Sequence, residues 1–435
     1  MRTAGIDIGT TTISAVVMEQ EQKRIVVSKT IPNGSFIHTS REWERIQNVT
    51  VICERARALL EELLGQYPDI ERIGLTGQMH GILYVNKEGT CISPLYTWQD
   101  GRGELPELDG ESSVSWIKRN LHLPVAAGYG LVTHFYHCRK GLVPKEAAVL
   151  CTVADYFGMT LTGRRVPLVH ASNAASMGFF DSEKGQFLEE LVQEAGMDTA
   201  LLPEVTSDMD ALGCYKGIPI TVAIGDNQAG FLGAVGMVEH TWLLNMGTGG
   251  QISVLSDTYY EAPGIEARPF LAGKYLLAGA SLCGGRAYAI LEKFFRRYAM
   301  ALGKQDEEQY DIMAKLLDTA SDQSDRMNVV TTFKGTRVNP EARGRITNIS
   351  EDNFTPEGLI CGVLMGMARE LYDLYTVIQS GTGIPVVHLV GSGNGLRKNK
   401  ALQDLFSELF QKQLILSELE EEAACGAAVS CSISA

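Results

Sequence analysis

Apolar residues recur along this chain at two spacings, and each spacing predicts one kind of element. Residues 5–17 read as an apolar strand, a Gly-Thr turn and a second strand of small and β-branched residues, which predicts a hairpin. Residues 243–255 repeat this pattern in the second half of the chain. Two matched hairpins predict a duplicated domain, and two ordinary hairpins with tight turns remain the alternative.

The segments after the first hairpin alternate between strand and helix patterns. Residues 24–29 predict a third strand, and residues 43–64 predict an amphipathic helix because apolar residues recur there at three-and-four spacing. A strand follows at residues 73–75. Three strands, a helix and a further strand resemble the start of the ribonuclease-H-like, actin-like fold. Residues 171–178 are mostly small, which predicts close packing and a structural role.

The second half predicts the same plan. The second hairpin is followed by two strands and a helix, predicted at residues 268–271, 275–280 and 286–298. A longer helix is predicted from Thr355 and Pro356, a favourable pair for a helix start, to about Ser380, with Gly381 after it. A strand at 386–390, a glycine loop and a helix at 399–411 then form a third candidate for contact with a nucleotide.

The length of 435 residues predicts two domains, and we place their boundary near Pro219, which gives domains 1–219 and 220–435. The net charge of −14 disfavours binding to nucleic acid but permits a small phosphorylated ligand. Nine cysteines without a Cys-x-x-Cys pair predict reduced thiols in a cytoplasmic protein. A strand that begins by Ala4 leaves no room for a signal peptide, and no apolar run approaches the roughly 20 residues of a membrane span.

The turns of the two hairpins are candidate phosphate cradles. Glycine lets an anion approach closely, while backbone N–H groups and threonine hydroxyls point into one concavity. Asp7 is the only charged residue in the first hairpin, and a carboxylate beside a phosphate predicts a bridging Mg²⁺. The residues of the two turns are Gly9, Thr10, Thr11 and Thr12, and Gly247, Thr248 and Gly249.

The loop at residues 96–102 has a composition that suits a carbohydrate. Trp98 offers a flat apolar face for sugar C–H groups, and Asp100 and Arg102 can fix hydroxyls. The alternative is a surface loop with an Asp-Arg salt bridge and a packed tryptophan. His122, His134 and His137 have no further ligands at metal-binding spacing, which favours packed histidines over a metal site.

An apolar strand at residues 218–225 ends abruptly at Gly225-Asp226-Asn227. The functional interpretation is a carboxylate presented at the end of a strand. The structural alternative is a helix cap supplied by Asp226 or Asn227.

With these motifs placed, the chain resembles the FGGY carbohydrate kinases over nearly its full length. Residues 5–11 and 246–249 are similar to the two phosphate motifs of that family, and Gly225-Asp226-Asn227 resembles the segment that bears its catalytic base. Residues 78–81 and 98–102 resemble its sugar-binding loops, and Gly391-Ser392-Gly393-Asn394 its adenosine motif. Within the family, residues 97–102 and 333–340 are most similar to sedoheptulokinases, while Gln78-Met79-His80-Gly81 is shared with xylulokinases.

The resemblance implies two ribonuclease-H-like α/β domains that close on Mg-ATP and a ketose in a cleft between them. Asp226 would accept the proton of a terminal primary hydroxyl, and Asp7 with Asp226 would hold Mg²⁺. The implied sugar contacts are Gln78, Met79, His80, Trp98, Asp100, Arg102, Asp226 and Asn227. The implied nucleotide contacts are Gly9, Thr10, Thr11, Thr12, Gly247, Thr248, Gly249, Gly391, Ser392, Gly393 and Asn394.

Two interpretations of other classes stay open. An actin-like ATPase would act on protein partners, and its turnover would not respond to sugars. A sugar-sensing pseudokinase would have lost a key carboxylate, whereas Asp7 and Asp226 are both present. The sequence leaves xylulose and other polyols open as substrates, and it leaves open whether the protein forms a homodimer.

Overall fold

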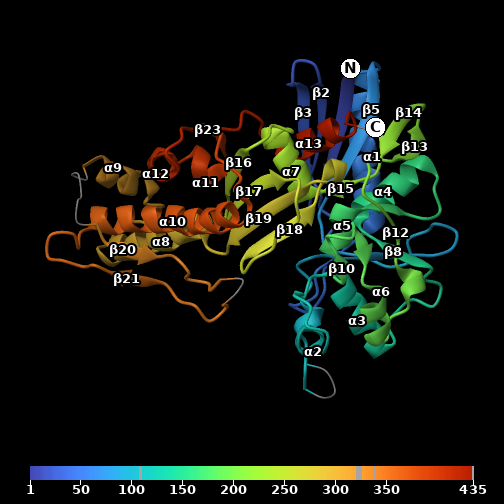
Figure 1. The fold of residues 1–435 in the computed structure, drawn as a ribbon, viewed down its shortest axis with the longest axis horizontal. Helices are drawn as coiled ribbons and strands as arrows, with labels where there is room; N and C mark the ends of the chain where they lie inside the picture. Colours follow the sequence, from blue (N-terminus) through green and yellow to red (C-terminus); the bar gives the residue numbers. More distant parts are fainter. Residues whose placement is uncertain (107–109, 320–325, 337–338, 434–435) are drawn as a thin grey trace. The chain divides into compact units, whose positions relative to one another are not determined.

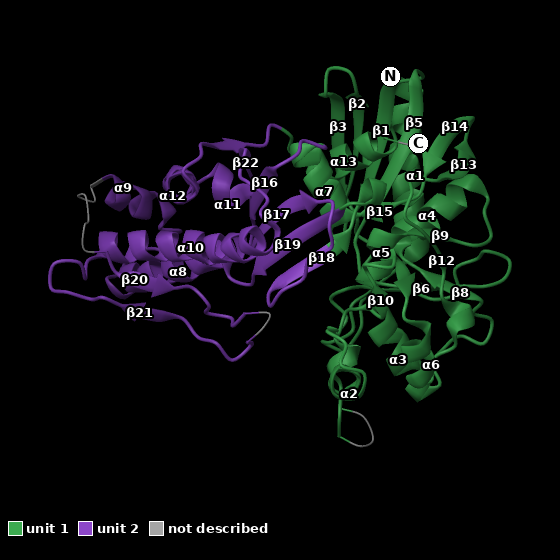
Figure 2. Cartoon of the chain, in the orientation of Figure 1, with its two compact units in different colours: residues 1–236, 268–274, 419–435 green, residues 237–267, 275–418 purple. Residues whose placement is uncertain are grey.

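The computed structural model describes residues 1–106, 110–319, 326–336 and 339–433 (Figure 1). The chain forms two compact units (Figure 2). The first contains residues 1–236, 268–274 and 419–435, so both ends of the chain belong to it. The second contains residues 237–267 and 275–418. Pro219, where we place the boundary from the sequence, lies within β14 of the first unit.

The first unit is built on a mixed sheet with the strand order β13-β14-β5-β1-β2-β3. Strands β1, β2 and β3 are antiparallel neighbours, whereas β5 runs parallel to β1 and β14 runs parallel to β5. A short strand, β15, also pairs with β5. The bounds are β1 Arg2–Ile8, β2 Thr12–Glu19, β3 Arg24–Pro32, β5 Ile70–Gly77, β13 Ala211–Tyr215, β14 Ile218–Thr221 and β15 Ile224–Gly225.

The second unit repeats this sheet with the strand order β18-β19-β17-β16-β22-β23, although the last two residues of β18, Arg268 and Pro269, belong to the first unit. Its antiparallel strands β16, β17 and β19 correspond to β1, β2 and β3, and the parallel strand β22 corresponds to β5. The predicted duplication is therefore confirmed. The bounds are β16 Thr241–Met246, β17 Gly250–Ser256, β18 Ile265–Pro269, β19 Tyr275–Ser281, β22 His388–Ser392 and β23 Leu414–Leu416.

Helices pack on the main sheet of each unit. None of the helices within the described ranges has the length and apolar character needed to cross a membrane. The helices of the first unit are α1 Val49–Gln66, α2 Ser113–Asn120, α3 Gly130–Lys140, α4 Val153–Thr162, α5 Ala171–Ser176, α6 Glu189–Glu194, α7 Asp226–Val235 and α13 Glu422–Ser430. Those of the second are α8 Gly284–Ala301, α9 Tyr310–Thr319, α10 Pro356–Thr382, α11 Asn394–Arg397 and α12 Lys400–Phe410.

Among the described residues, the short strands outside the two main sheets form five pairs. They are β4 Ile46–Gln47 with β7 Leu95–Tyr96, β6 Leu83–Val85 with β8 Val149–Cys151, β9 Leu168–His170 with β12 Glu204–Thr206, β10 Phe180–Asp181 with β11 Gln186–Phe187, and β20 Asn328–Val330 with β21 Arg345–Thr347. Single turns of 3₁₀-helix cover Arg102–Glu104 (η1), Thr199–Leu201 and Leu271–Gly273.

The predicted ends of two helices differ from the structure, because capping residues set where each helix begins or ends. The first amphipathic helix begins at Val49 rather than near Trp43, because the Asn48 side chain caps it by accepting the Val51 N–H at 3.2 Å. The long helix begins at Pro356 as predicted but continues past Gly381 to a left-handed Gly383, whose φ is 72°. Gly381 instead lies under the ring of Tyr260.

The terminal helix α13 packs unusually close to the first sheet, because glycines let backbones touch. A Cβ on Gly5 of β1 would lie 1.9 Å from the Ala424 carbonyl oxygen, and one on Gly74 of β5 would lie 1.8 Å from that of Ala427. Helix α13 meets α7 in the same way, since a Cβ on Gly426 would lie 1.8 Å from the Ala229 oxygen. The end of the chain is thereby fixed against β1, β5 and α7.

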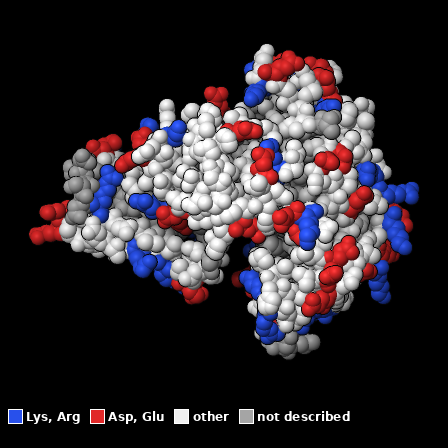
Figure 3. Space-filling model, in the orientation of Figure 1, with Lys and Arg blue, Asp and Glu red and all other residues white. Residues whose placement is uncertain are grey.

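Charge and thiols add little to the architecture. On the face shown in Figure 3, Lys and Arg side chains lie among Asp and Glu side chains. The nine cysteines are free thiols; Cys151, Cys283, Cys425 and Cys431 are buried, whereas Cys214 is exposed.

The glycine contacts yield a stability prediction. Gly74→Ala should lower the free energy of unfolding by about 2–3 kcal/mol, because its methyl group would overlap a backbone carbonyl that cannot rotate away. Gly65→Ala is the control. A Cβ added at that position in α1 would meet no described atom within 4 Å beyond its own helix backbone, so alanine there should stabilise the helix by up to about 1 kcal/mol. Denaturant unfolding of both variants measures the difference. Equal stabilities would contradict the packing account.

Candidate functional site

The first hairpin turn presents its N–H groups outward, because protein side chains hold its carbonyl groups. Asn33 Nδ2 donates to the Gly9 oxygen at 2.7 Å, and Gln47 Nε2 donates to the Thr10 oxygen at 2.8 Å. In a planar trans peptide the N–H points opposite to the C=O. The N–H groups of Thr10 and Thr11 therefore face away from these two amides, which gives the turn an anion-binding edge.

Asp7 lies directly beneath this turn in β1. Its Oδ1 is buried and has no hydrogen-bond partner among the residues that the structure describes. Burial, followed by the negative charges of Asp226 and Glu421, raises the pKa of Asp7 to about 7. A buried carboxylate oxygen without a donor, close to two further carboxylates, favours a hard cation, and Mg²⁺ prefers such oxygen ligands. The residues present therefore fit Mg²⁺.

Glu421 reaches this region through a polar row that crosses three strands. Asp7 is paired with Ser14 across β1 and β2, and Ser14 with Thr30 across β2 and β3. The hydroxyl oxygens of Ser14 and Thr30 lie 2.9 Å apart, and the Thr30 hydroxyl donates to Glu421 Oε1 at 2.8 Å. Glu421 immediately precedes α13, so the packing of that helix sets its position.

Asp226 is the first residue of α7, directly after β15. The cap of the helix is Gly225, so Asp226 is not the N-cap residue that the structural alternative requires. Burial raises the pKa of Asp226 to about 6, opposed by a hydrogen bond from the Asn227 N–H and by the charge of Arg268. The Asn227 side chain in turn accepts a hydrogen bond from Arg268 at 2.5 Å.

The segment Gln78-Met79-His80 continues β5 and serves three different purposes. Gln78 is buried; its N–H donates to the Ile8 oxygen at 2.9 Å, and its side-chain oxygen accepts from the Thr10 hydroxyl at 3.3 Å. Met79 is buried against Gly225, where a Cβ would lie 2.6 Å from the Met79 methyl carbon. His80 is only partly buried and stacks on the Tyr129 ring, with 4.8 Å between centroids.

The Trp98 loop divides into an exposed tryptophan and a buried ion pair. Trp98 is 47% exposed, and its Nε1–H donates to the Thr10 hydroxyl at 3.0 Å, which links the loop to the phosphate turn. Asp100 and Arg102 are both buried and are joined by bonds of 2.6 and 3.0 Å. Asp100 also accepts the Arg45 N–H at 3.0 Å, so this pair fixes the shape of the loop.

The histidines near this loop are packed core residues. Arg102 donates to His137 Nε2 at 2.6 Å, so His137 Nδ1 carries the proton and donates to the Tyr84 hydroxyl at 3.0 Å. That hydroxyl then donates to His134 Nδ1 at 2.8 Å. Burial, with the charge of Arg102 second, lowers the pKa of His137 to about 3.

In the second unit, the structure brings together the second turn and the glycine loop after β22. Asn245 Nδ2 donates to the Ser392 hydroxyl at 2.8 Å, and a Cβ on Gly393 would lie 2.6 Å from the Met246 oxygen. The turn Gly247-Thr248-Gly249 also contacts the start of α8, where the Gly285 N–H donates to the Gly247 oxygen at 3.0 Å. The loop 391–394 therefore lies directly beside the turn 247–249.

Matches to known proteins identify the chain. The model of the N-terminal domain of the FGGY family of carbohydrate kinases matches residues 3–233, and that of its C-terminal domain matches residues 243–435. The chain belongs to the FGGY family of carbohydrate kinases. It is accordingly an ATP-dependent sugar kinase.

Individual relatives of this FGGY kinase agree in length and fold. The Mus musculus sedoheptulokinase is 26% identical over 476 aligned residues, which cover 98% of this chain and 96% of the relative. The Homo sapiens sedoheptulokinase is 25% identical and is covered to the same extent. Among solved structures, xylulose kinase from Rhodospirillum rubrum matches with a TM-score of 0.85 at 21% identity. The match covers 100% of this chain and 90% of the xylulose kinase chain, which shows the shared fold.

A role for four residues that contact the candidate site residues was not predicted from the sequence. Asn33, Gln47 and Glu421 lie far along the chain from the groups that they hold, and an isolated amide or carboxylate carries no local pattern. Gly285 did carry a signal, because a Gly-Gly pair between a strand and a helix permits close approach of a backbone.

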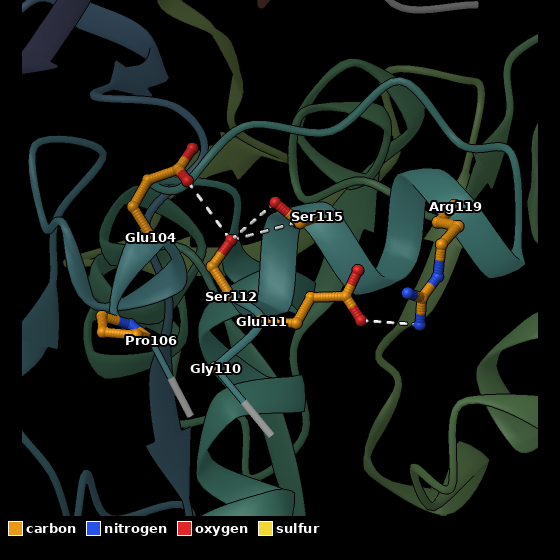
Figure 4. A pocket seen from close by; sticks show the side chains of 7 residues that line it. All are labelled: Glu104, Pro106, Gly110, Glu111, Ser112, Ser115 and Arg119. Carbon is orange, nitrogen blue, oxygen red and sulfur yellow. Dashed lines mark hydrogen bonds and ion pairs between the residues drawn. The ribbon is translucent and has the colours of Figure 1, made fainter. Parts of the chain in front are cut away.

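A separate pocket of the kinase lies between η1 and α2 (Figure 4). Glu111 forms an ion pair with Arg119 at 2.7 Å there, and the Ser112 hydroxyl lies between Glu104 and Ser115. Its lining includes no predicted site residue. We assign it no role in phosphoryl transfer.

The raised pKa of Asp7 predicts a pH-dependent stability of the metal-free enzyme. An unfolded Asp ionises near pH 3.9, whereas the folded carboxyl ionises near pH 7, so Asp7 costs stability progressively as the pH rises between these values. Asp7→Asn in EDTA should therefore be more stable than the wild type by roughly 4 kcal/mol at pH 8 and no more stable at pH 4. Denaturant unfolding at both pH values measures this, with Asp208→Asn as an exposed control. If Asp7→Asn were no more stable than the wild type at pH 8, burial of the Asp7 carboxylate would not destabilise the fold.

Proposed function

We propose that this kinase transfers the γ-phosphoryl group of Mg-ATP to the terminal primary hydroxyl of a ketose, and that the ketose is sedoheptulose, giving sedoheptulose 7-phosphate. The observation that carries the proposal is the position of Asp226. Its carboxyl group lies at the start of a helix, has a raised pKa, and is close enough to Asp7 for the two charges to interact. The choice of sedoheptulose rests on the two sedoheptulokinases matched along almost their full length.

In this proposal Asp226 is the general base. Phosphoryl transfer involves little covalent work by the protein, so alignment of the hydroxyl and neutralisation of charge dominate. The raised pKa lets the carboxylate accept a proton near neutral pH more readily than an ordinary Asp. Asp7 and Asp226 would hold Mg²⁺, which when bound neutralises the phosphate charge.

Burial supports a division of the sugar-loop residues into those that contact the sugar and those that hold the loops. We assign direct sugar contact to the more accessible His80, Trp98 and Asn227. The buried Gln78, Met79, Asp100 and Arg102 hold the loops in place through the bonds described above.

We assign the contacts to ATP to the two hairpin turns and to the glycine loop after β22. Thr10, Thr11 and Thr12 with Gly247, Thr248 and Gly249 would cradle the phosphates, and Gly391 to Asn394 would border adenosine. In the stretch 333–340, which resembles sedoheptulokinases, residues 337 and 338 lie outside the described part of the chain.

The general-base assignment predicts a specific loss. Asp226→Asn should reduce turnover at least about 100-fold, because it removes the proton acceptor but keeps the size of the side chain. Protection of the enzyme against heat by the sugar should persist. Steady-state kinetics and thermal shifts measure both, with Asp208→Asn as the matched control. Near-normal turnover of Asp226→Asn would assign the base to another residue.

The substrate assignment predicts that sedoheptulose exceeds xylulose in kcat/KM by at least about tenfold. A shorter ketose anchored at the same end would hold its terminal hydroxyl too far from the phosphorus, and about 1 Å of misplacement can cost 100-fold in rate. The difference should lie in kcat more than in KM. An ATP-coupled assay with both sugars decides this. An equal or higher value for xylulose would overturn the sedoheptulose assignment only, whereas ATP turnover that no sugar affects would favour the ATPase alternative.

A further inference from the structure

The short helix α5 contacts two segments that the proposed function places in the site. From the sequence its small residues predict only close packing. In the structure, two of its serines, Ser172 and Ser176, each bind the backbone of a different segment. Both side chains are buried.

Ser172 holds the residue that precedes the proposed base. Its hydroxyl oxygen accepts the Gly225 N–H at 2.9 Å. The direction of the hydroxyl is fixed, because His170 Nδ1 accepts the Ser172 N–H at 3.1 Å and so must be the unprotonated nitrogen. The Ser172 hydroxyl donates to the same Nδ1 at 2.8 Å, which leaves its lone pairs for Gly225.

A neighbouring residue of α5 holds the same strand end. Asn173 Nδ2 donates to the Ala223 oxygen at 3.0 Å, two residues before Gly225. It also lies 3.4 Å from the buried carboxylate of Asp155, which accepts the Thr152 hydroxyl at 2.6 Å. The backbone that leads into Asp226 is therefore tied to α5 on both sides of Ile224.

Ser176 holds His80 in a conformation that side chains rarely adopt. The φ of His80 is 71°, which costs energy unless the surroundings impose it. The Ser176 hydroxyl accepts the His80 N–H at 3.0 Å and donates to the Asn173 oxygen at 2.7 Å. The Ser176 carbonyl accepts His80 Nδ1–H at 2.7 Å, which fixes the ring and leaves Nε2 as its acceptor.

We propose that Ser172 and Ser176 are positioning residues with separate duties: Ser172 sets the place of the base Asp226, and Ser176 sets the place of the sugar contact His80. This proposal rests on the proposed function. One short helix thereby aligns the general base with the sugar loop. Replacing serine by alanine at these two positions, which lie one helical turn apart, should therefore change different kinetic constants: kcat at Ser172 and the KM for the sugar at Ser176.

Kinetics of Ser172→Ala and Ser176→Ala test the proposal. Ser172→Ala should lower kcat about tenfold with the KM for the sugar within twofold of the wild type, because the base moves while the sugar loop stays. Ser176→Ala should raise the KM for the sugar at least about fivefold with kcat within twofold. The thermal shift caused by Mg-ATP should be unchanged in Ser176→Ala, because His80 is assigned to the sugar alone.

A merely structural role predicts the same pattern in the two variants, or no kinetic change, and either result overturns the proposal. If Ser172→Ala does not fold, Ser172→Cys replaces it, since sulfur keeps the shape but is a weak acceptor. Normal turnover of a folded Ser172→Cys would also overturn the proposal. Asp226→Asn, assayed in parallel, separates the two claims: if it is active, the assignment of Asp226 as the general base fails, and if it alone is inactive, only the role of α5 fails.

Discussion

The structure of the first unit depends on a backbone contact that only glycine permits. Gly5, Gly74 and Gly426 bring α13 to within van der Waals distance of β1, β5 and α7. Because α13 comes from the end of the chain and β1 from its start, this contact closes the unit (Figure 2). It also places Glu421, Asp7 and Asp226 near one another, and the charges of Glu421 and Asp226 add to the effect of burial in raising the pKa of Asp7.

The duplicated sheets use the same position for different chemistry. Asp7 and Asn245 both lie two residues before the turn glycine of their hairpin, on strands with the same neighbours. Asn245 is neutral and bonds to Ser392, whereas Asp7 can ionise and its buried Oδ1 has no hydrogen-bond partner among the described residues. The two hairpins therefore differ at this position in whether the side chain can ionise.

The sequence predicted the parts whose signal is local. The hairpins, the succession of strands and helices along the chain, and the long helix follow from periodicity and caps, and the six motifs together indicated the family. Contacts between distant segments were not predictable: nothing near Asp100 and Arg102 shows that they are buried, and nothing near Asn33 shows that it orients the first turn. The role of residues 171–178 was underestimated, because serines in a small-residue run look like packing until their partners are known.

The central claim is that Asp226 receives the proton from the terminal hydroxyl of a ketose beside a metal ion held by Asp7. A crystal structure with sedoheptulose, Mg²⁺ and a non-hydrolysable ATP analogue tests it most directly. We predict that the terminal hydroxyl oxygen lies within about 3.2 Å of an Asp226 carboxylate oxygen, and that Mg²⁺ lies beside Asp7, directly or through water. A terminal hydroxyl bonded to a different base, or Mg²⁺ bound away from Asp7, would contradict the account.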